Sequence, residues 1–232
     1  MKRIGSLERK YVLDVLDSQF RSSQGANYMT KFENAFKEKF ESKFAISHVN
    51  GTATMHSVLE AAGIGIGDEV IVPPLTMSAT SLAVLHANAT PVFADVDIDT
   101  FNIDPKSIEK NITAKTKAII TVALYGLSPD MDPIMSLAKK YNLLVIEDNA
   151  QAFLSYYKTK LVGTFGDAAS FSFQSSKHLS SGEGGIITTN NQDLAIGVRK
   201  VTGLGYKNIS ATKARISKDE IQHPSFERHD YI

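Results

Sequence analysis

Short apolar runs alternate along this chain with stretches of helical spacing, and this alternation limits the fold more than any other feature. The runs of strand length lie at residues 44–49, 69–72, 91–94, 118–122 and 143–146. The helical stretches lie at about residues 51–62, 77–88 and 132–141, and a further charged stretch precedes the first run. Asp132 and Pro133 are predicted to be the N-cap and first residue of the third of these helices. The chain is therefore predicted to form an α/β fold, a mostly parallel sheet covered by helices on both faces.

A parallel sheet also predicts where a ligand binds, because ligands occupy the crevice beyond the carboxyl ends of the strands. This rule picks out three segments: residues 50–53, residues 147–151 and the segment after Ala168. Chemistry is therefore expected in these three places.

Composition excludes several classes of protein. The 25 basic and 25 acidic residues balance, so the sequence gives no electrostatic reason to expect nucleic acid or an anionic membrane as a partner. Cysteine is absent, which excludes disulfides and thiolate metal sites. Residues 1–22 lack an apolar leader, and no apolar run is long enough to span a bilayer. We expect a cytoplasmic protein with one domain over residues 1–232.

The turn at residues 50–53 reads Asn-Gly-Thr-Ala, follows a predicted strand and opens a predicted helix. Free backbone N–H groups and the helix dipole make such a turn suitable for an anion such as phosphate. Gly51 would allow close backbone approach, and Thr52 would add a hydroxyl donor. A plain turn with a threonine near the N-cap explains the same residues.

Asp148 stands where a predicted buried strand ends, so its carboxylate either caps the next helix or faces a cationic ligand. Glu147 should point to the opposite face of the sheet, because side chains alternate along a strand.

Lys177 lies among hydroxyl residues and glycines in a segment that is otherwise uncharged between Asp167 and Glu183, His178 aside. A lone lysine is usually a solvated surface group. A partly desolvated lysine has a lowered pKa and can form a Schiff base. The glycines at residues 63–67 do not match a dinucleotide-binding fingerprint, and the sequence has no P-loop, zinc-protease motif or serine-hydrolase elbow. The scattered histidines predict no metal site.

Taken together and in order, these segments are far more specific than any one of them. The order is Asn-Gly-Thr-Ala at 50–53, Glu-Asp-Asn-Ala-Gln at 147–151, Ser-Phe followed by Lys177 at 172–177, and Gly-Glu-Gly-Gly at 182–185. It resembles the DegT/StrS-type aminotransferases, which act on keto sugars attached to nucleotides. The resemblance extends over nearly the whole chain, from about residue 4 to residue 232.

The resemblance implies the aspartate-aminotransferase fold and the cofactor pyridoxal 5'-phosphate. Lys177 would carry the cofactor through a Schiff base and, once released, move the proton between the donor carbon and the cofactor. Asp148 would pair with the pyridinium nitrogen and keep it protonated, so that the ring remains an electron sink.

The resemblance also implies the residues that would contact the cofactor. Thr52, the amide of Ala53 and Ser172 would hold the phosphate, with Gly51 in the same turn. Gln151 would lie beside the ring, near its phenolic oxygen. Met77 occupies the position where the family commonly stacks an aromatic residue on the ring; a thioether can pack there, but less rigidly.

Family members continue into a smaller C-terminal domain, which is absent from residues 1–232, and they place the site at a homodimer interface. The resemblance therefore implies a homodimer, with an amino acid and a nucleotide sugar as substrates.

Three functions follow from these observations. The leading hypothesis is transfer of an amino group from an amino acid such as glutamate to a nucleotide-linked keto sugar, or a related cyclitol ketone, in lipopolysaccharide or polysaccharide biosynthesis. A second is a sugar dehydratase of the same family, in which histidine replaces the lysine; His178 raises this alternative, but the spacing from Glu183 places Lys177 at the lysine position. A third is an inactive fragment that acts as a binding module.

Overall fold

The computed structural model describes residues 4–20, 27–203 and 205, and residues 206–232 of the predicted domain lie outside this part. Its strands are β1 (Phe44–His48), β2 (Glu69–Val72), β3 (Thr90–Phe93), β4 (Thr116–Val122), β5 (Leu144–Asp148), β6 (Tyr156–Tyr157), β7 (Lys160–Leu161), β8 (Ala168–Ser172) and β9 (Gly185–Thr189). Its helices are α1 (Ser6–Asp17), α2 (Tyr28–Lys39), α3 (Gly51–Ala61), α4 (Ala79–His86), α5 (Pro105–Asn111), α6 (Met131–Tyr141), α7 (Gln192–Thr202) and the 3₁₀ turn η2 (Leu124–Gly126).

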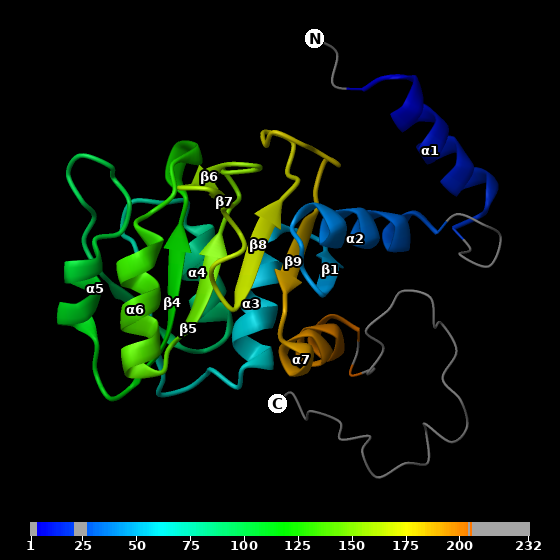
Figure 1. Cartoon of the computed structure of the whole chain (residues 1–232). Coiled ribbons are helices and arrows are strands. Elements are labelled where there is room, and N and C mark those ends of the chain that lie inside the picture. Colours follow the sequence, from blue (N-terminus) through cyan, green and yellow to red (C-terminus); the bar gives the residue numbers. More distant parts are fainter. Residues whose placement is uncertain (1–3, 21–26, 204, 206–232) are drawn as a thin grey trace.

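Seven strands form one sheet in the order β1-β9-β8-β5-β4-β2-β3, while β6 and β7 form a separate hairpin. The pairs from β3 through β2, β4 and β5 to β8 are all parallel. Strand β9 pairs antiparallel with both β8 and β1, so within the described residues it alone runs against the rest of the sheet (Figure 1). The prediction of a mostly parallel sheet is confirmed.

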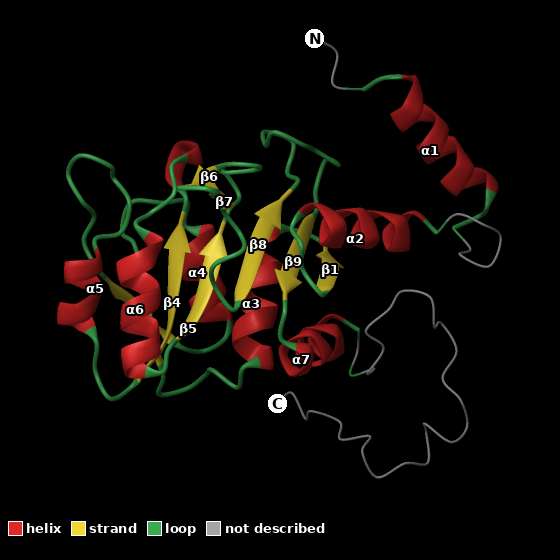
Figure 2. Ribbon diagram, viewed as in Figure 1, coloured by secondary structure: helices red, strands yellow, loops and turns green. Residues whose placement is uncertain are grey.

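Helices cover both faces of this sheet, as predicted (Figure 2). The side chains of each strand alternate between the two faces, so each face has its own apolar core. Val70, Ile120 and Ile146 pack on one face in a cluster with α3, α4 and α7. On the other face, Ile119 and Val145 pack with α5 and α6. Aromatic side chains from α2 form a third cluster on β8 and β9. The result is a sheet with apolar layers above and below it.

The helix predicted from Asp132 and Pro133 begins earlier than expected. Helix α6 starts at Met131 with Asp130 as its N-cap, so Pro133 stands at the third helical position. Proline is tolerated there because the first turn of a helix has no intrahelical acceptor for its N–H groups.

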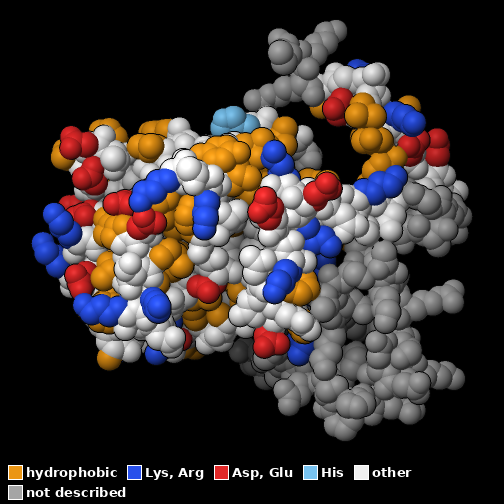
Figure 3. Space-filling model, in the orientation of Figure 1, with side chains coloured by type: hydrophobic (Ala, Val, Ile, Leu, Met, Phe, Trp, Pro, Cys, Tyr) orange, Lys and Arg blue, Asp and Glu red, His pale blue; other side chains and the backbone are white. Residues whose placement is uncertain are grey.

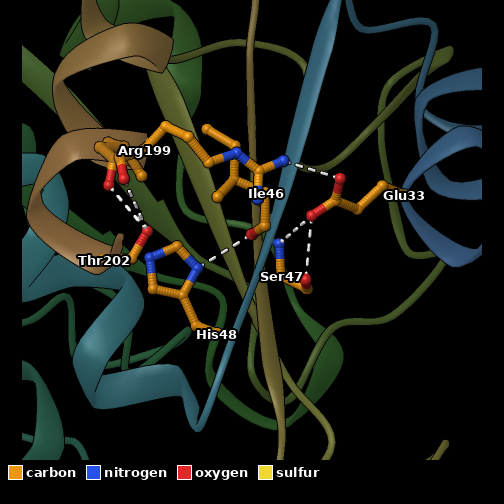
Figure 4. A network of polar contacts seen from close by, with 7 residues as sticks. Glu33, Ile46, Ser47, His48, Arg199 and Thr202 are labelled. Carbon is orange, nitrogen blue, oxygen red and sulfur yellow. Dashed lines mark hydrogen bonds and ion pairs between the residues drawn. The ribbon is translucent and has the colours of Figure 1, made fainter. Parts of the chain in front are cut away.

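A partly buried network joins α2, β1 and α7 at the edge of the sheet (Figure 4). Arg199 Nη2 lies 2.7 Å from Glu33 Oε2. The backbone amide and the hydroxyl of Ser47 each donate to Glu33 Oε1 at 2.9 Å. In the same network, the ring nitrogen Nδ1 of His48 lies 2.9 Å from the carbonyl oxygen of Ile46. These contacts fix the strand that leads into the turn at residues 50–53.

Helix α1 differs from the other helices, because none of its residues is buried and it extends away from the sheet (Figure 1). Basic and acidic side chains are interspersed over the face drawn in Figure 3, in keeping with the balanced composition. No helix among the described residues is both long and apolar enough to cross a membrane.

Candidate active site

A cavity of about 390 Å³ lies where the strands β4, β5 and β8 end, in the position that the parallel sheet predicts. Seven of the eight predicted site residues line it: Gly51, Thr52, Met77, Asp148, Gln151, Ser172 and Lys177. They come from the start of α3, the segment before α4, the end of β5 and the loop after it, and the region from β8 to β9. The fold thus brings together segments that are up to 126 positions apart in the sequence, between Gly51 and Lys177.

The first turn of α3 forms one wall of the cavity. Asn50 is the N-cap, and the amides of Gly51 and Thr52 precede any intrahelical acceptor. A Cβ atom placed on Gly51 would lie 3.0 Å from the Cβ and 3.4 Å from the Oγ of Ser172. Only a residue without a side chain therefore lets the helix N-terminus and the serine hydroxyl share one small anion-binding cradle.

Ala53 is the one predicted residue that the structure does not bring to the cavity. Its amide donates to Oδ1 of Asn50 at 2.8 Å, and Ala53 is absent from the residues that line the cavity. The expected contact between this amide and a phosphate is therefore not available in this structure, because the N-cap side chain already satisfies the donor.

Asp148, the last residue of β5, lines the cavity although its side chain is only 5% exposed. Its Oδ1 accepts the amide of Ala150 at 3.1 Å, and its Oδ2 accepts the hydroxyl of Thr80 at 3.0 Å. Burial raises the pKa of the Asp148 carboxyl, while these two hydrogen bonds and the positive charge of Lys177 oppose the rise. A turn follows Asp148, so the alternative that it caps a helix is wrong.

Glu147 points to the other face of the sheet, as the alternation of strand side chains predicts. Its carboxylate accepts the backbone amides of Gly163, Phe165 and Gly166 at 2.6–2.7 Å. Burial raises the pKa of Glu147, and these three donors act in the opposite direction. Glu147 thus holds the turn behind the sheet, whereas Asp148 faces the cavity.

Lys177 lies in the loop between β8 and β9, where its side chain is half-buried and lines the cavity with Asp148. Its backbone amide donates to the carbonyl oxygen of Gln174 at 2.9 Å, which closes a turn before the lysine. His178, the next residue, is exposed and is not among the residues that line the cavity. The loop therefore presents the lysine to the cavity, as the sequence spacing predicts.

Gln151 and Met77 occupy two further parts of the wall. The side-chain oxygen of Gln151 accepts the amide of Tyr125 at 3.0 Å, which leaves its amide nitrogen as the group that can donate to a ligand. The side chain of Met77 is 62% exposed at the mouth of the cavity. Tyr125 itself has a φ of 53°, so its backbone is in the left-handed region where it meets Gln151.

Several lining residues were not predicted from the sequence, among them Thr76, Gln174, Ser176 and Glu183. Their proximity to predicted residues in the chain was the available signal, since three of them flank Lys177 in the same loop. Among the described residues, no group of histidine and acidic side chains could hold a metal ion.

The residues of the cavity fit pyridoxal phosphate. The cradle between α3 and Ser172 suits a phosphate, and the buried carboxylate of Asp148 suits a cationic ring nitrogen. Lys177 supplies an amine that lines the same cavity. This combination, at the carboxyl ends of a seven-stranded sheet with this order, defines a pyridoxal-phosphate-binding domain with the aspartate-aminotransferase fold.

The chain belongs to the DegT/DnrJ/EryC1/StrS aminotransferase family, whose model matches residues 2–221. It is 48% identical over 203 residues to a GDP-perosamine synthase of Caulobacter vibrioides, covering 88% of this chain and 54% of that protein. An aminotransferase structure from Psychrobacter cryohalolentis matches with a TM-score of 0.80 and 40% identity, covering 90% of this chain and 57% of that one. NtdA from Bacillus subtilis, with bound cofactor PMP, matches with a TM-score of 0.77 and 32% identity, covering 93% and 49%.

The chain spans about half the length of the relatives that it matches. The family model and the solved structures confirm the predicted family and fold, and pyridoxal phosphate is the cofactor of this class.

Proposed function

We propose that residues 1–232 form the cofactor-binding large domain of a transaminase that transfers an amino group from an amino acid to a nucleotide-linked keto sugar. The observation that carries the proposal is the pairing of Lys177 and the buried Asp148 in one cavity, beside the cradle formed by α3 and Ser172. A surface lysine or a structural aspartate would explain either residue alone, but neither explains why both line the same cavity.

When bound, pyridoxal phosphate supplies an electron sink for the charge left as a Cα–H bond of the amino acid breaks. Asp148 would accept a hydrogen bond from the ring nitrogen and keep its proton in place. Lys177 would hold the cofactor through its Nζ atom and, once released, would move the proton between the donor carbon and the cofactor. Asp148 would thus stabilise charge, and Lys177 would transfer the proton.

The remaining residues bind and orient the cofactor. The hydroxyls of Thr52 and Ser172 and the free amides at the start of α3 would hold the phosphate. The side-chain oxygen of Gln151 accepts the amide of Tyr125, and its amide nitrogen would donate to the phenolic oxygen of the ring. Met77 would cover the ring with its thioether.

The relatives support the sugar substrate, since the protein from Caulobacter vibrioides is a GDP-perosamine synthase. We propose a nucleotide-linked keto sugar as acceptor, glutamate as donor, and a cytoplasmic role in lipopolysaccharide or polysaccharide biosynthesis. We also propose a homodimer. Apolar side chains gather along the upper edge of the view in Figure 3, and Tyr125 and Leu127 in the loop after β4 are 83% and 52% exposed.

The test is covalent trapping of the cofactor on the chain. Purified protein is incubated with pyridoxal phosphate, reduced with sodium borohydride, digested and analysed by mass spectrometry. We expect the modification on the peptide that contains Lys177. The variant Lys177→Ala should lose it, whereas Lys139→Ala, which changes an exposed lysine at the end of α6, should keep it.

The outcomes separate the three functions considered for this chain. Trapping at Lys177 together with amino transfer to a nucleotide keto sugar supports the transaminase. Release of water from the sugar without trapping at Lys177 supports the dehydratase. Absence of any trapped cofactor refutes the proposal and leaves the binding module.

A further inference from the structure

The hydroxyl of Thr80 contacts Asp148 from a different element of the fold. Thr80 is the second residue of α4, its side chain has no exposed surface, and its Oγ1 lies 3.0 Å from Oδ2 of Asp148. The other carboxylate oxygen, Oδ1, accepts the amide of Ala150 at 3.1 Å. Each oxygen of the carboxylate therefore has one donor, one from its own loop and one from α4.

The donors in this contact have a fixed direction. An ionised carboxylate only accepts hydrogen bonds, so the single proton of the Thr80 hydroxyl is directed to Asp148. Thr76 Oγ1 lies 3.2 Å from Thr80 Oγ1, and the Thr80 oxygen is then the acceptor in that pair. The three groups form a chain, Thr76 to Thr80 to Asp148, in which each hydrogen bond polarises the next.

This chain ties the carboxylate to the wall of the cavity. Thr76 and Asp148 both line the cavity, whereas Thr80 lies behind them and does not. Rotation of the carboxylate about its χ2 angle would break the contact with Thr80 and leave a buried hydroxyl without its acceptor. Such a loss is costly in a site with little solvent.

We propose that Thr80 is a positioning residue, which fixes the Asp148 carboxylate in the orientation that receives the ring nitrogen of the cofactor; this rests on the proposed function. The hydrogen bond also acts on charge. Burial raises the pKa of Asp148 and the Thr80 hydroxyl lowers it, so Thr80 favours the ionised form that a ring N–H needs as its acceptor.

The test compares two cofactor probes on the same chain. Pyridoxal phosphate and its 1-deaza analogue, in which C–H replaces the ring nitrogen, are titrated by absorbance or fluorescence. Asp148 can distinguish them, because only the first offers a ring nitrogen. In Thr80→Val, which replaces the hydroxyl by a methyl group of similar size, we expect pyridoxal phosphate to bind roughly tenfold more weakly and the analogue to bind unchanged. Thr80→Ser keeps the hydroxyl and should retain the affinity for both probes.

The comparison between valine and serine separates positioning from packing. If the γ-methyl group were what mattered, valine would preserve binding and serine would lose it, which would overturn the proposal. Equal loss of both probes in Thr80→Val would also overturn it. If the valine variant does not fold, Thr80→Ala against Thr80→Ser gives the same comparison, since both lack the methyl group.

The wild-type chain shows which proposal has failed. If it binds both probes equally well, Asp148 does not contact the ring nitrogen and the proposed role of Asp148 fails, together with this inference. If it prefers pyridoxal phosphate and Thr80→Val shows the same preference, only the positioning role of Thr80 fails.

Discussion

Breaking the buried pair between Glu33 and Arg199 is predicted to destabilise the chain strongly, and by a different amount for each of the two residues. Glu33→Leu removes the carboxylate that pairs with the guanidinium of Arg199, whose side chain is 12% exposed. It also removes the acceptor of both the amide and the hydroxyl of Ser47 (Figure 4). Ser47 lies in the strand that leads into the turn at residues 50–53. Arg199→Met leaves the carboxylate with both Ser47 donors in place. The first change should therefore be the more damaging.

The magnitudes follow from the ion pair and the hydrogen bonds that each change removes. Loss of one member of a buried ion pair costs about 3–5 kcal/mol. An orphaned buried amide adds roughly 1–3 kcal/mol. Glu33→Leu should therefore cost about 4 kcal/mol or more, and Arg199→Met about 3 kcal/mol. The double variant should be less destabilised than the sum of the two, because no charge is left alone.

Urea unfolding followed by circular dichroism measures these differences through the midpoint at constant slope. Glu109→Gln is the matched control, since it alters an ion pair with Lys140 in which both side chains are well exposed, and its midpoint should not change. A cost below about 1 kcal/mol for Glu33→Leu would show that the pair does not hold α2 and α7 on β1. A larger cost for Arg199→Met than for Glu33→Leu would refute the argument about the Ser47 donors.

Three further predictions concern the cradle, the partly buried His48 and Met77 at the mouth of the cavity. A Cβ atom on Gly185 would lie 2.5 Å from the carbonyl oxygen of Asn50. Gly185→Ala should therefore lower the free energy of unfolding by about 1–3 kcal/mol and weaken cofactor binding. Gly65→Ala, where the added Cβ would lie 3.4 Å from its nearest neighbour, should do neither. Burial lowers the pKa of His48 to about 4, so between pH 6.5 and 4 the unfolded chain binds a proton at this residue and the folded chain does not. The free energy of unfolding should therefore fall by up to about 3 kcal/mol as the pH drops from 6.5 to 4. His48→Gln should flatten that part of the plot of urea midpoint against pH. Met77→Phe should tighten pyridoxal phosphate binding roughly two- to tenfold in a direct titration, because an aromatic ring stacks more rigidly than a thioether; weaker binding would show that the position does not cover the ring.

The sequence predicts the bounds of β1 and β2 closely. Residues 69–72 match β2 and residues 44–49 match β1 to within one position. Three of the four residues of β2 are buried, whereas β1 lies at the edge of the sheet and buries Ala45 and Ile46. Strand β5 continues two residues past the predicted run, through Glu147 and Asp148. Charged residues are usually read as a strand end. Here backbone amides from residues 163–166 satisfy one carboxylate, and Thr80 and Ala150 satisfy the other.

The parts that the sequence did not predict depend on tertiary pairing. Strand β8 consists of small and hydroxyl residues apart from Phe171, and its antiparallel partner β9 gives no local sign of its direction. For the site, the motif order predicted seven residues that line the cavity, but the loss of the Ala53 amide to Asn50 is a side-chain choice that spacing cannot show. Thr80 was missed for a related reason, since a buried threonine in a helix has no pattern that distinguishes it from packing.

The position of β9 in the sheet also sets the order in which the chain can fold during synthesis. Among the described strands, β1 has one neighbour in the sheet, and its residues 44–48 pair with residues 185–189. While the ribosome is still translating the residues between them, β1 has nothing to pair with, and the N-terminus of α3 lacks the serine hydroxyl that completes its cradle. Parallel strands β2 to β5 can associate earlier, because their partners emerge closer together. If translation stalls while residue 189 is still inside the exit tunnel, the nascent chain should expose the apolar strand β1 and depend on chaperones.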